Sequence, residues 1–469
     1  MFSIQQISNV CVDFFNASLR KILAQELSLA QLSPNLDQLV NQIGVATMTT
    51  LLEQADAAIY AAIRPNHQYQ VKDHRVRTMT TLWGDVTFSR TYYQCKADSS
   101  YHADSSYHYL LDEWLGLDKS THIEPLCRAR LVTRSADVSY RKAAAPTTPT
   151  SLSGQSVLLS IRKLGTLPNQ VAAMPEAKPE IHKVYVEADE DHAAMQKCPA
   201  KEMKLINVYD SKVSVCRGRR KLCGRRTFSG WEAPSQLWPE VNQYIQQVYG
   251  AEQTPEVVIK GDAAQWIKAG TNYIAQSTHV VDGYHASQYL RKIAGKGTSR
   301  VLYDALRAND QAAFVQEVQR KLRTGPERKK PIMDGYQYIL SNWDGVHKAL
   351  TQPDATSSTE GHVSHMLSER MSSRCMGWSP VGAEQVARMR TYIANGGNLE
   401  AYAQKRFASG GQMTELNINR EVLKKEWNFR KLKYCTYIPE KADDMPDRES
   451  TLTGGWMRLI ENGGYQHIM

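Results

Sequence analysis

The chain has 469 residues, of which 42% are hydrophobic and 22% charged, a composition typical of a globular protein of about three domains. Lys and Arg outnumber Asp and Glu by 57 to 48, an excess that fits a polyanionic partner as well as a merely basic enzyme. The sequence shows no apolar run long enough to span a membrane, no signal-peptide pattern and no C-x-x-C pair, so we expect a cytoplasmic protein with reduced thiols and neither a membrane partner nor a zinc site.

The first part of the chain predicts two regions. Residues 1–66 form a helical N-terminal region, because apolar residues recur at helical spacing from Leu27 to Ile63. Residues 67–120 alternate as strands do and predict a small β-module, with a hairpin that turns at Gly84-Asp85. The hexapeptide Ala-Asp-Ser-Ser-Tyr-His occurs twice in tandem at 97–108. We interpret this repeat as a duplication in a surface loop and assign it no function.

Residues 121–167 predict a helix-turn-helix-like DNA-binding region. The order is helix, helix, turn, helix, and Ser153 is a suitable N-cap for the last helix. In a helix-turn-helix the last helix enters the major groove, where its polar residues contact bases and phosphates. An ordinary three-helix core is the alternative. The residues expected to contact DNA are Gln155, Ser156, Arg162 and Lys163.

Residues 180–295 predict the first part of an α/β core. Three strands are followed by a helix, a strand, a helix and a strand, and this order is that of a ribonuclease-H-like fold. The expected elements are the strand at His182 to His192, the strand at Met203 to Tyr209, a third strand region at Lys212 to Phe228, the helix at Pro234 to Tyr249, and strands ending at Asp262 and Asp282.

The third strand region is strongly basic. A cluster of this kind can hold the phosphate backbone of DNA, although a solvated hairpin is an equally good interpretation. Its basic residues are Arg217, Arg219, Arg220, Lys221, Arg225 and Arg226.

Acidic residues follow the strands of the predicted core. Val257-Val258-Ile259-Lys260-Gly261-Asp262 and Thr278 to Asp282 each read as a strand that ends in a carboxylate, with His285 close behind the second. Open α/β sheets bind ligands at the carboxyl ends of their strands. Three carboxylates at one edge can hold two Mg²⁺ ions, which prefer oxygen ligands and can promote phosphodiester cleavage.

The acidic motifs, taken together, resemble those of a known family. Glu187-Ala-Asp189-Glu-Asp-His, Gly261-Asp262-Ala-Ala-Gln-Trp-Ile, Asp282-Gly-Tyr-His285 and Thr359-Glu360-Gly-His-Val-Ser-His resemble the ISLre-type insertion-sequence transposases, which are DDE enzymes related to the Mutator-type group. The resemblance implies that Asp189, Asp262 and Glu360 are the catalytic acids. They would bind two Mg²⁺ or Mn²⁺ ions per active site.

Several assignments stay open. Asp191 lies on the same strand face as Asp189 and is an alternative or additional metal ligand. Glu369 and Glu384 are alternatives to Glu360, which also fits a helix-dipole role in a first turn. Related Mutator-type enzymes carry Cys-x-x-His where this chain has Asp282 and His285. That pair can orient DNA, support a carboxylate or form a hydrogen bond in the core.

The C-terminal part predicts three further regions. Residues 296–350 form a helical insertion, residues 351–395 continue the core and carry the third acid, and residues 396–469 form a basic helical region with a polar tail. The stretch from His362 to Trp378 is rich in Ser, His and Arg. We expect Arg370 and Arg374 to contact DNA near the cleaved end and Trp378 to stack on a base, unless Trp378 is a core residue.

These features predict a DNA transposase that binds the terminal inverted repeats of its own element. Its acids would direct water onto a phosphodiester and then direct the freed 3′ hydroxyl onto target DNA. Pairing of two DNA ends implies a homodimer or a higher oligomer, and DNA binding implies association with the nucleoid. The alternatives are a ribonuclease-H-like nuclease or resolvase without strand transfer, and a DNA-binding repressor without catalysis.

Overall fold

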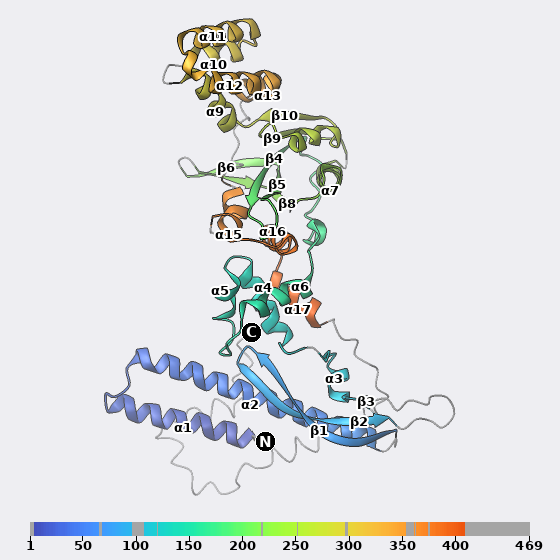
Figure 1. The fold of residues 1–469 in the computed structure, drawn as a ribbon. Helices are drawn as coiled ribbons and strands as arrows, with labels where there is room; N and C mark the ends of the chain where they lie inside the picture. The colour runs from blue at the N-terminus through green and yellow to red at the C-terminus, as the bar shows by residue number, and fades with distance from the viewer. Residues whose placement is uncertain are drawn as a thin grey trace. The chain divides into compact units, whose positions relative to one another are not determined.

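The computed structural model describes residues 4–64, 68–95, 107–119, 121–216, 219–250, 252–295, 299–352, 361, 363–373 and 376–408 (Figure 1). These residues belong to two compact units. Of the described residues, the first contains those up to Thr78 together with Val86–Lys119, and the second contains Met79–Asp85 and those from Thr121 to Ala408.

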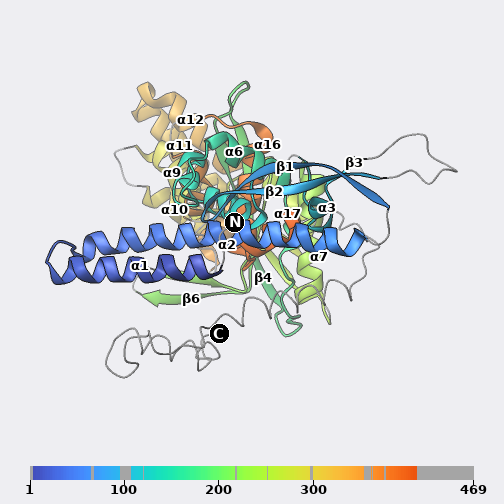
Figure 2. The same ribbon diagram turned by 90° about the horizontal axis from the view of Figure 1, so that it is seen from below.

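The first unit combines a helical hairpin with a small sheet. The helices α1 and α2 lie side by side (Figures 1 and 2). Apolar side chains from α2, the sheet and a short helix form its core, which includes Ile59, Phe88 and Leu111. The elements are α1 (Ile4–Leu23), α2 (Leu29–Ile63), β1 (Tyr69–Thr81), β2 (Gly84–Cys95), β3 (Tyr107–His108) and α3 (Leu110–Trp114).

The hairpin between β1 and β2 turns one dipeptide earlier than the sequence predicts. The turn lies at Leu82 and Trp83, and Gly84 is already the first residue of β2. The Thr81 hydroxyl donates to the Gly84 carbonyl over 2.8 Å and accepts from Trp83 N over 3.2 Å. Gly84 has φ +126°, which glycine adopts without the steric cost of a Cβ. These bonds fix the turn before Gly84-Asp85.

The second unit is built on a mixed five-stranded sheet. Its strands are β4 (Lys183–Ala193), β5 (Lys201–Tyr209), β8 (Arg226–Gly230), β9 (Glu256–Gly261) and β10 (Ser277–Val281). The order across the sheet is β10-β9-β4-β5-β8. β4, β9 and β10 are parallel, and β5 runs antiparallel to both β4 and β8. The first strand of the sheet therefore lies at its centre, beside the fourth.

Helix α7 (Pro234–Tyr249) covers one face of this sheet, as Figure 1 shows. Its buried residues, among them Trp238 and Ile245, pack with Val184 and Val186 of β4 and with Ile259 of β9. The sequence predicts this helix with the bounds that the structure has. Three short helical turns connect the elements of the unit: η2 (Asn169–Val171), α8 (Gln265–Lys268) and η3 (Ala269–Asn272).

The basic segment expected to be one strand region is divided in the structure. A separate hairpin of β6 (Ser211–Cys216) and β7 (Arg219–Cys223) precedes the sheet strand β8. Gly224 ends the hairpin with φ +60°, and a Cβ there would overlap the Asp210 carboxylate. The side chains of β6 are nearly all exposed, so this hairpin has no apolar face with which to join the sheet.

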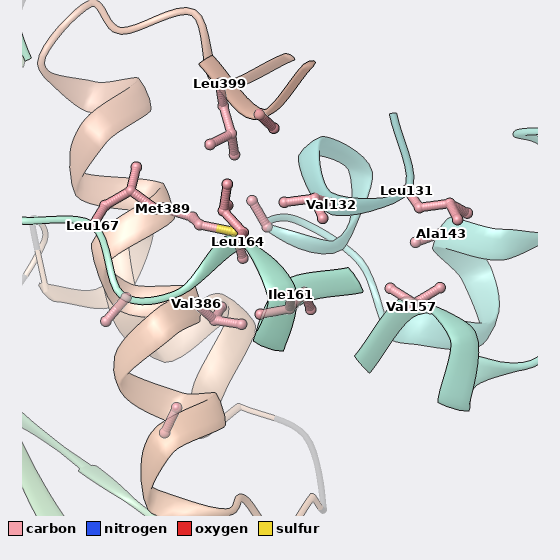
Figure 3. Close-up of a cluster of buried hydrophobic side chains, with 14 of the residues drawn as sticks. Leu131, Val132, Ala143, Val157, Ile161, Leu164, Leu167, Val386, Met389 and Leu399 are labelled. Atoms are coloured by element: carbon pink, nitrogen blue, oxygen red, sulfur yellow. The ribbon is translucent and has the colours of Figure 1, made fainter. Parts of the chain in front are cut away.

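The helices predicted as a helix-turn-helix share their core with later helices. They are α4 (Pro125–Ser135), α5 (Tyr140–Ala144) and α6 (Gly154–Leu164), and they pack with α16 (Pro380–Ala394) and α17 (Leu399–Ala408). Figure 3 shows Val157 and Ile161 of α6 among side chains of α4 and α5, with Val386 of α16 beside them. The Ser153 hydroxyl accepts from Ser156 N over 3.2 Å, which confirms the predicted N-cap. Residues 121–167 are thus part of a larger core.

The segment predicted as a helical insertion is a series of helices joined by short turns in its described part. It contains α10 (Arg300–Arg307), α11 (Gln311–Thr324), η4 (Pro326–Arg328), α12 (Lys329–Ser341) and α13 (Trp343–Thr351), which pack on α9 (Gly283–Ala294). The chain then continues in a π-helical turn, η5 (Ser364–Ser368), and a short helix, α15 (Glu369–Met371). Of the helices described, none has the length and apolar character that crossing a bilayer requires.

Candidate active site

Two aspartates lie side by side where the central strands of the sheet come together. β4 and β9 run parallel and stay in register up to the pair Glu187 and Lys260. Asp189 and Asp262 each follow two residues later, and strand alternation gives them the same face. The charge of Asp262 raises the pKa of Asp189, so the two carboxyl groups interact.

A glycine allows the two strands to approach closely beside these acids. A Cβ on Gly261 would lie 2.5 Å from the Ala188 carbonyl oxygen and 2.9 Å from Ile267 Cδ1. Both contacts are closer than packed atoms allow, so any other residue must push β9 away from β4.

Replacing Gly261 with Ala should therefore lower the free energy of unfolding by about 1–3 kcal/mol, the usual cost of overpacking. Urea denaturation measures this change. The matched control is Gly283→Ala, because a Cβ on Gly283 meets no atom within 4 Å. Equal stability of the two variants would contradict the close approach.

Asp189 has an unusually high pKa for a carboxyl group. Burial raises its pKa to about 6, and the charges of Glu190 and Asp262 act in the same direction. The Glu190 main-chain N–H, which donates to Asp189 Oδ1 over 2.9 Å, and His285 oppose the shift. Among the residues that the structure describes, no Lys or Arg forms an ion pair with Asp189 or Asp262. A pair of acids left without a cation is a suitable site for a divalent metal ion.

Asp262 is held by its surroundings in a fixed position. Its Oδ1 accepts from Ala264 N over 2.8 Å, and its carbonyl oxygen accepts from His279 Nε2 over 3.1 Å. Burial lowers the pKa of His279, which favours the neutral ring that makes this bond. The charge of Asp262 also raises the pKa of Tyr338, a residue of α12 that is otherwise shifted by its burial. The helical insertion therefore contributes a phenol close to the acids.

Asp282 and His285 have different roles in the structure. Asp282 follows β10, its N–H donates to the Gly261 carbonyl over 2.6 Å, and its Oδ1 caps α9 by accepting from Tyr284 N over 2.8 Å. His285 lies in the first turn of α9 and lowers the pKa of Asp189 through its charge. In the described part of the chain its buried Nδ1 has no hydrogen-bond partner. The geometry thus places a helix cap at Asp282 and an imidazole near the acidic pair.

Asp191 lies on the same face as Asp189 but is bonded to another element. Its Oδ1 accepts from the hydroxyls of Ser368 and Ser372 over 3.0 and 2.8 Å. These serines belong to η5 and to the residues that follow α15, and the carboxylate therefore attaches that helical segment to β4. Asp191 is not among the groups whose charge shifts the pKa of Asp189.

The third predicted acid, Glu360, lies outside the described residues. The segment that begins with Gly361 packs on the core through Val363 and Leu367. One alternative acid, Glu369, is exposed and lies 4.0 Å from Arg390.

The other alternative, Glu384, has its pKa raised by burial and by Glu232. Asp189 and Asp262 are not among the groups that shift it. Neither alternative acid is brought to the aspartate pair by the described geometry.

A buried charged network that the sequence analysis did not identify lies beside the acids. Glu187 is fully buried and its Oε1 accepts from Lys212 Nζ over 2.7 Å and from Tyr209 Oη over 2.9 Å. Lys260, 2% exposed, places its Nζ 3.5 Å from Tyr209 Oη and 4.5 Å from the centre of the Tyr185 ring. The sequence does contain a signal for this network, because Glu187 and Lys260 are ionisable residues within otherwise apolar strands.

A second group of ligand-type side chains lies on the other face of β4. Glu190, His192 and Glu202 each offer an atom within 4.8 Å of the others. Trp266 Nε1 donates to Glu190 Oε2 over 2.6 Å, and burial together with the charge of Asp262 raises the pKa of Glu190. This group is therefore a second possible metal-binding site, close to the one predicted at Asp189 and Asp262.

The residues of α6 predicted to contact DNA remain accessible. Gln155, Arg162 and Lys163 are exposed, and Ser156 is half-buried beside its cap. The apolar positions of the same helix, Val157 among them, face the core. The polar face of α6 is thus available to a ligand.

The basic residues after β6 lie in different environments. Arg217 lies outside the described residues, as do the side chains of Arg219 and Arg220, and Lys221 is exposed on β7. Arg225 is half-buried, whereas Arg226 is 4% exposed and donates to the carbonyl oxygens of Asn169, Ala172 and Ala173.

Arg370 and Trp378 lie in the interior of the second unit. Arg370 is 3% exposed, its Nε donates to the Ser135 carbonyl over 3.2 Å, and its guanidinium carbon lies 4.7 Å from the centre of the Trp378 ring. Trp378 Nε1 donates to the Met371 carbonyl over 2.9 Å. Trp378 is thus a core residue, which is the alternative that the sequence analysis left open to stacking on a base. Arg374 lies outside the described residues.

The chain is similar to one protein-family model and to several proteins of one bacterium. The model of the uncharacterised protein family UPF0236 matches residues 22–406. UPF0236 protein TTE2489 of Caldanaerobacter subterraneus subsp. tengcongensis is 28% identical over 390 residues, which cover 81% of each chain. A second relative from that organism is 28% identical over 417 residues, 86% of each chain, and its name joins eleven designations, from TTE0033 to TTE2212.

Proposed function

The chain belongs to the UPF0236 family, and we propose that it is a DNA transposase of the DDE type, which cleaves and joins DNA with the help of divalent metal ions. The observation that carries this proposal is the pair Asp189 and Asp262. Asp189 lies on β4 and Asp262 directly follows the neighbouring parallel strand β9, and the charge of Asp262 raises the pKa of Asp189. Among the described residues, no Lys or Arg forms an ion pair with either of them.

The order of the elements supports a ribonuclease-H-like core for this chain. Three strands, a helix, a strand, a helical turn and a strand follow one another, interrupted by the hairpin of β6 and β7. The first strand, β4, lies at the centre beside β9, the fourth strand of the sheet. This arrangement brings acids that are far apart in the sequence to one place, as a metal-binding site of this class requires.

The donor atoms of the pair suit Mg²⁺ or Mn²⁺. Carboxylate oxygens are the ligands that these hard ions prefer, and Asp189 and Asp262 would bind them together with Glu360, the predicted third ligand. Two bound ions would supply Lewis-acid stabilisation of the attacking and leaving oxygens. The chain itself holds Asp262 through Ala264 N and His279, and keeps His285 beside Asp189. A transposase would use this one site for both hydrolysis and strand transfer.

The eleven designations joined in the name of one relative agree with a mobile element. One protein that carries eleven designations in one organism is the result expected when an element inserts repeatedly into a genome. We extend this interpretation to the present chain as part of the proposal.

The exposed cations of α6 and β7 are the proposed DNA contacts. Arg162, Lys163 and Lys221 can neutralise phosphates, and Gln155 can bond to base edges. The protein would bind the inverted-repeat ends and the target DNA as a homodimer or a higher oligomer, because two ends must be joined in one complex.

A cleavage assay tests the proposal. The purified chain is incubated with labelled DNA that spans the borders of its own gene, with Mg²⁺, Mn²⁺ or EDTA. We expect metal-dependent nicks at a fixed border position and, with target DNA added, joined products. Nicks without joined products would support the nuclease or resolvase instead. Bound but uncut DNA with either metal would contradict both enzymes and favour the repressor.

A further inference from the structure

A cavity of about 280 Å³ lies on the second unit, away from the acidic pair. It is formed by the linker before β4, the start of β8 and the end of α7, and its lining includes Met174, Lys178, Tyr244 and Val248. β8 runs parallel to β4, because β5 is antiparallel to both. The start of β8 therefore lies at the opposite edge of the sheet from Asp189 and Asp262.

In the described part of the chain, no carboxylate is among the groups that shift the pKa of Arg225 or Arg226, the two arginines at this cavity. Arg226 is 4% exposed and directs its terminal nitrogens to main-chain carbonyls, and its buried Nε has no partner in the described chain. Arg225 is half-buried, and burial lowers the pKa of both guanidinium groups. The nearby Lys178 is paired with Asp210 over 2.6 Å, so that acid is already neutralised. Among the described residues, Arg225 and Arg226 are therefore two positive charges at the cavity without a carboxylate partner.

Buried charges in proteins are almost always paired, since desolvation of an unpaired ion costs several kcal/mol. An anion held in the cavity would balance the charges of Arg225 and Arg226, because carbonyl oxygens bond to Arg226 without neutralising it. A guanidinium presents a planar set of donors that matches two oxygens of a phosphate. Tyr244 and Val248, which are both buried, line the cavity beside the two arginines, and the exposed Met174 lies at its opening to solvent. We propose that this cavity binds a phosphate group, supplied by a free nucleotide or by the DNA backbone.

Arg225 is the residue with which to test this site. Arg226 also fixes the linker through three carbonyl groups, and its loss would disturb the fold. Arg225 is half-buried and makes no such bonds in the described structure. Replacement of Arg225 by Gln should leave the fold intact while it removes one charged contact to the anion. Arg225→Lys keeps the charge but loses the planar donor pair, so its affinity should lie between those of the wild type and Arg225→Gln.

Calorimetric titration with inorganic phosphate and with adenosine monophosphate tests the proposal on the full chain. Loss of one charge-assisted contact should weaken binding by about tenfold or more in Arg225→Gln. The matched control Arg323→Gln, at an exposed position on α11, should bind as the wild type does. Circular dichroism verifies that each variant is folded. No binding by the wild type, or equal binding by folded Arg225→Gln, overturns the proposal.

A competition experiment distinguishes the two sources of phosphate. If a short DNA duplex displaces adenosine monophosphate from the wild type, and Arg225→Gln reduces the salt dependence of duplex binding, the group belongs to the DNA backbone. If the duplex leaves the nucleotide bound, the ligand is a free nucleotide. Both results depend on phosphate binding by Arg225, and they remain informative if the proposed transposase activity is not found.

Discussion

Replacement of Asp189 by Asn should make the metal-free protein more stable at neutral pH. The folded chain raises the pKa of Asp189 to about 6, mainly by burial, whereas an unfolded chain leaves it near 3.9. The native state therefore binds the proton more tightly, and stability falls as pH rises from about 4 to about 6. Above that range the ionised carboxylate costs the fold about 1–3 kcal/mol, which Asn avoids.

The same change should abolish the proposed activity. Losing a residue that supports a metal ligand costs up to about a hundredfold in affinity or activity, and loss of a ligand itself should exceed this. Denaturation in EDTA at pH 4 and pH 7.5 measures the stability, and the border-DNA assay measures cleavage. The gain in stability should be present at pH 7.5 and small at pH 4. Asp304→Asn, at an exposed residue of α10, serves as the control. A variant less stable than the wild type at pH 7.5 would contradict this explanation of the raised pKa.

Replacement of Lys260 by Met should destabilise the protein severely. Lys260 is the register partner of the fully buried Glu187, and both lie on the strand face that carries the acidic pair. Removing one charge from a buried network of charged groups should cost about 3–5 kcal/mol, as it does for a buried ion pair, because the remaining ion keeps its desolvation penalty. In this variant Lys212 and Tyr209 still bond to Glu187, so we expect a loss near the lower end of this range.

Urea denaturation of Lys260→Met beside Lys221→Met isolates this effect, since Lys221 is exposed on β7. The control should change the unfolding free energy by less than about 0.5 kcal/mol. The double variant Lys260→Met with Glu187→Leu should lose less stability than the two single variants combined, because both residues bond to Tyr209 Oη. Similar stability of Lys260→Met and Lys221→Met would refute the role assigned to the buried network.

The position of the acidic pair could be predicted because it depends on local patterns. The run from Val257 to Ile259 is buried and β-branched, so a strand ending at Gly261 and Asp262 follows from the sequence. The same holds for β4, whose alternation predicts that Asp189 and Asp191 share a face. Their different partners were not predictable, because Ser368 and Ser372 lie far along the chain from Asp191.

The hydrogen-bond partners of the arginines could likewise not be predicted from the sequence. Arg226 and Arg370 stand in basic stretches that suggest DNA contacts, yet both are buried and bond to carbonyl oxygens of distant residues. Charge patterns predict exposure on average, while the fold decides which charged side chain replaces water with main-chain acceptors. The exposed hairpin of β6 and β7 agrees with the solvated hairpin that the basic run left open. Its separation from the sheet strand β8 was missed for a related reason, since one basic run gave no sign of the break at Gly224.

The central claim is that the acidic pair performs metal-dependent DNA cleavage, and one comparison tests it most directly. Wild type, Asp262→Ala and the control Asp304→Ala are assayed with Mn²⁺ on DNA that spans the borders of the gene. We predict nicks at a fixed border position for the wild type and for Asp304→Ala, and none for folded Asp262→Ala. Cleavage by Asp262→Ala at the wild-type rate would show that the pair is not the catalytic centre.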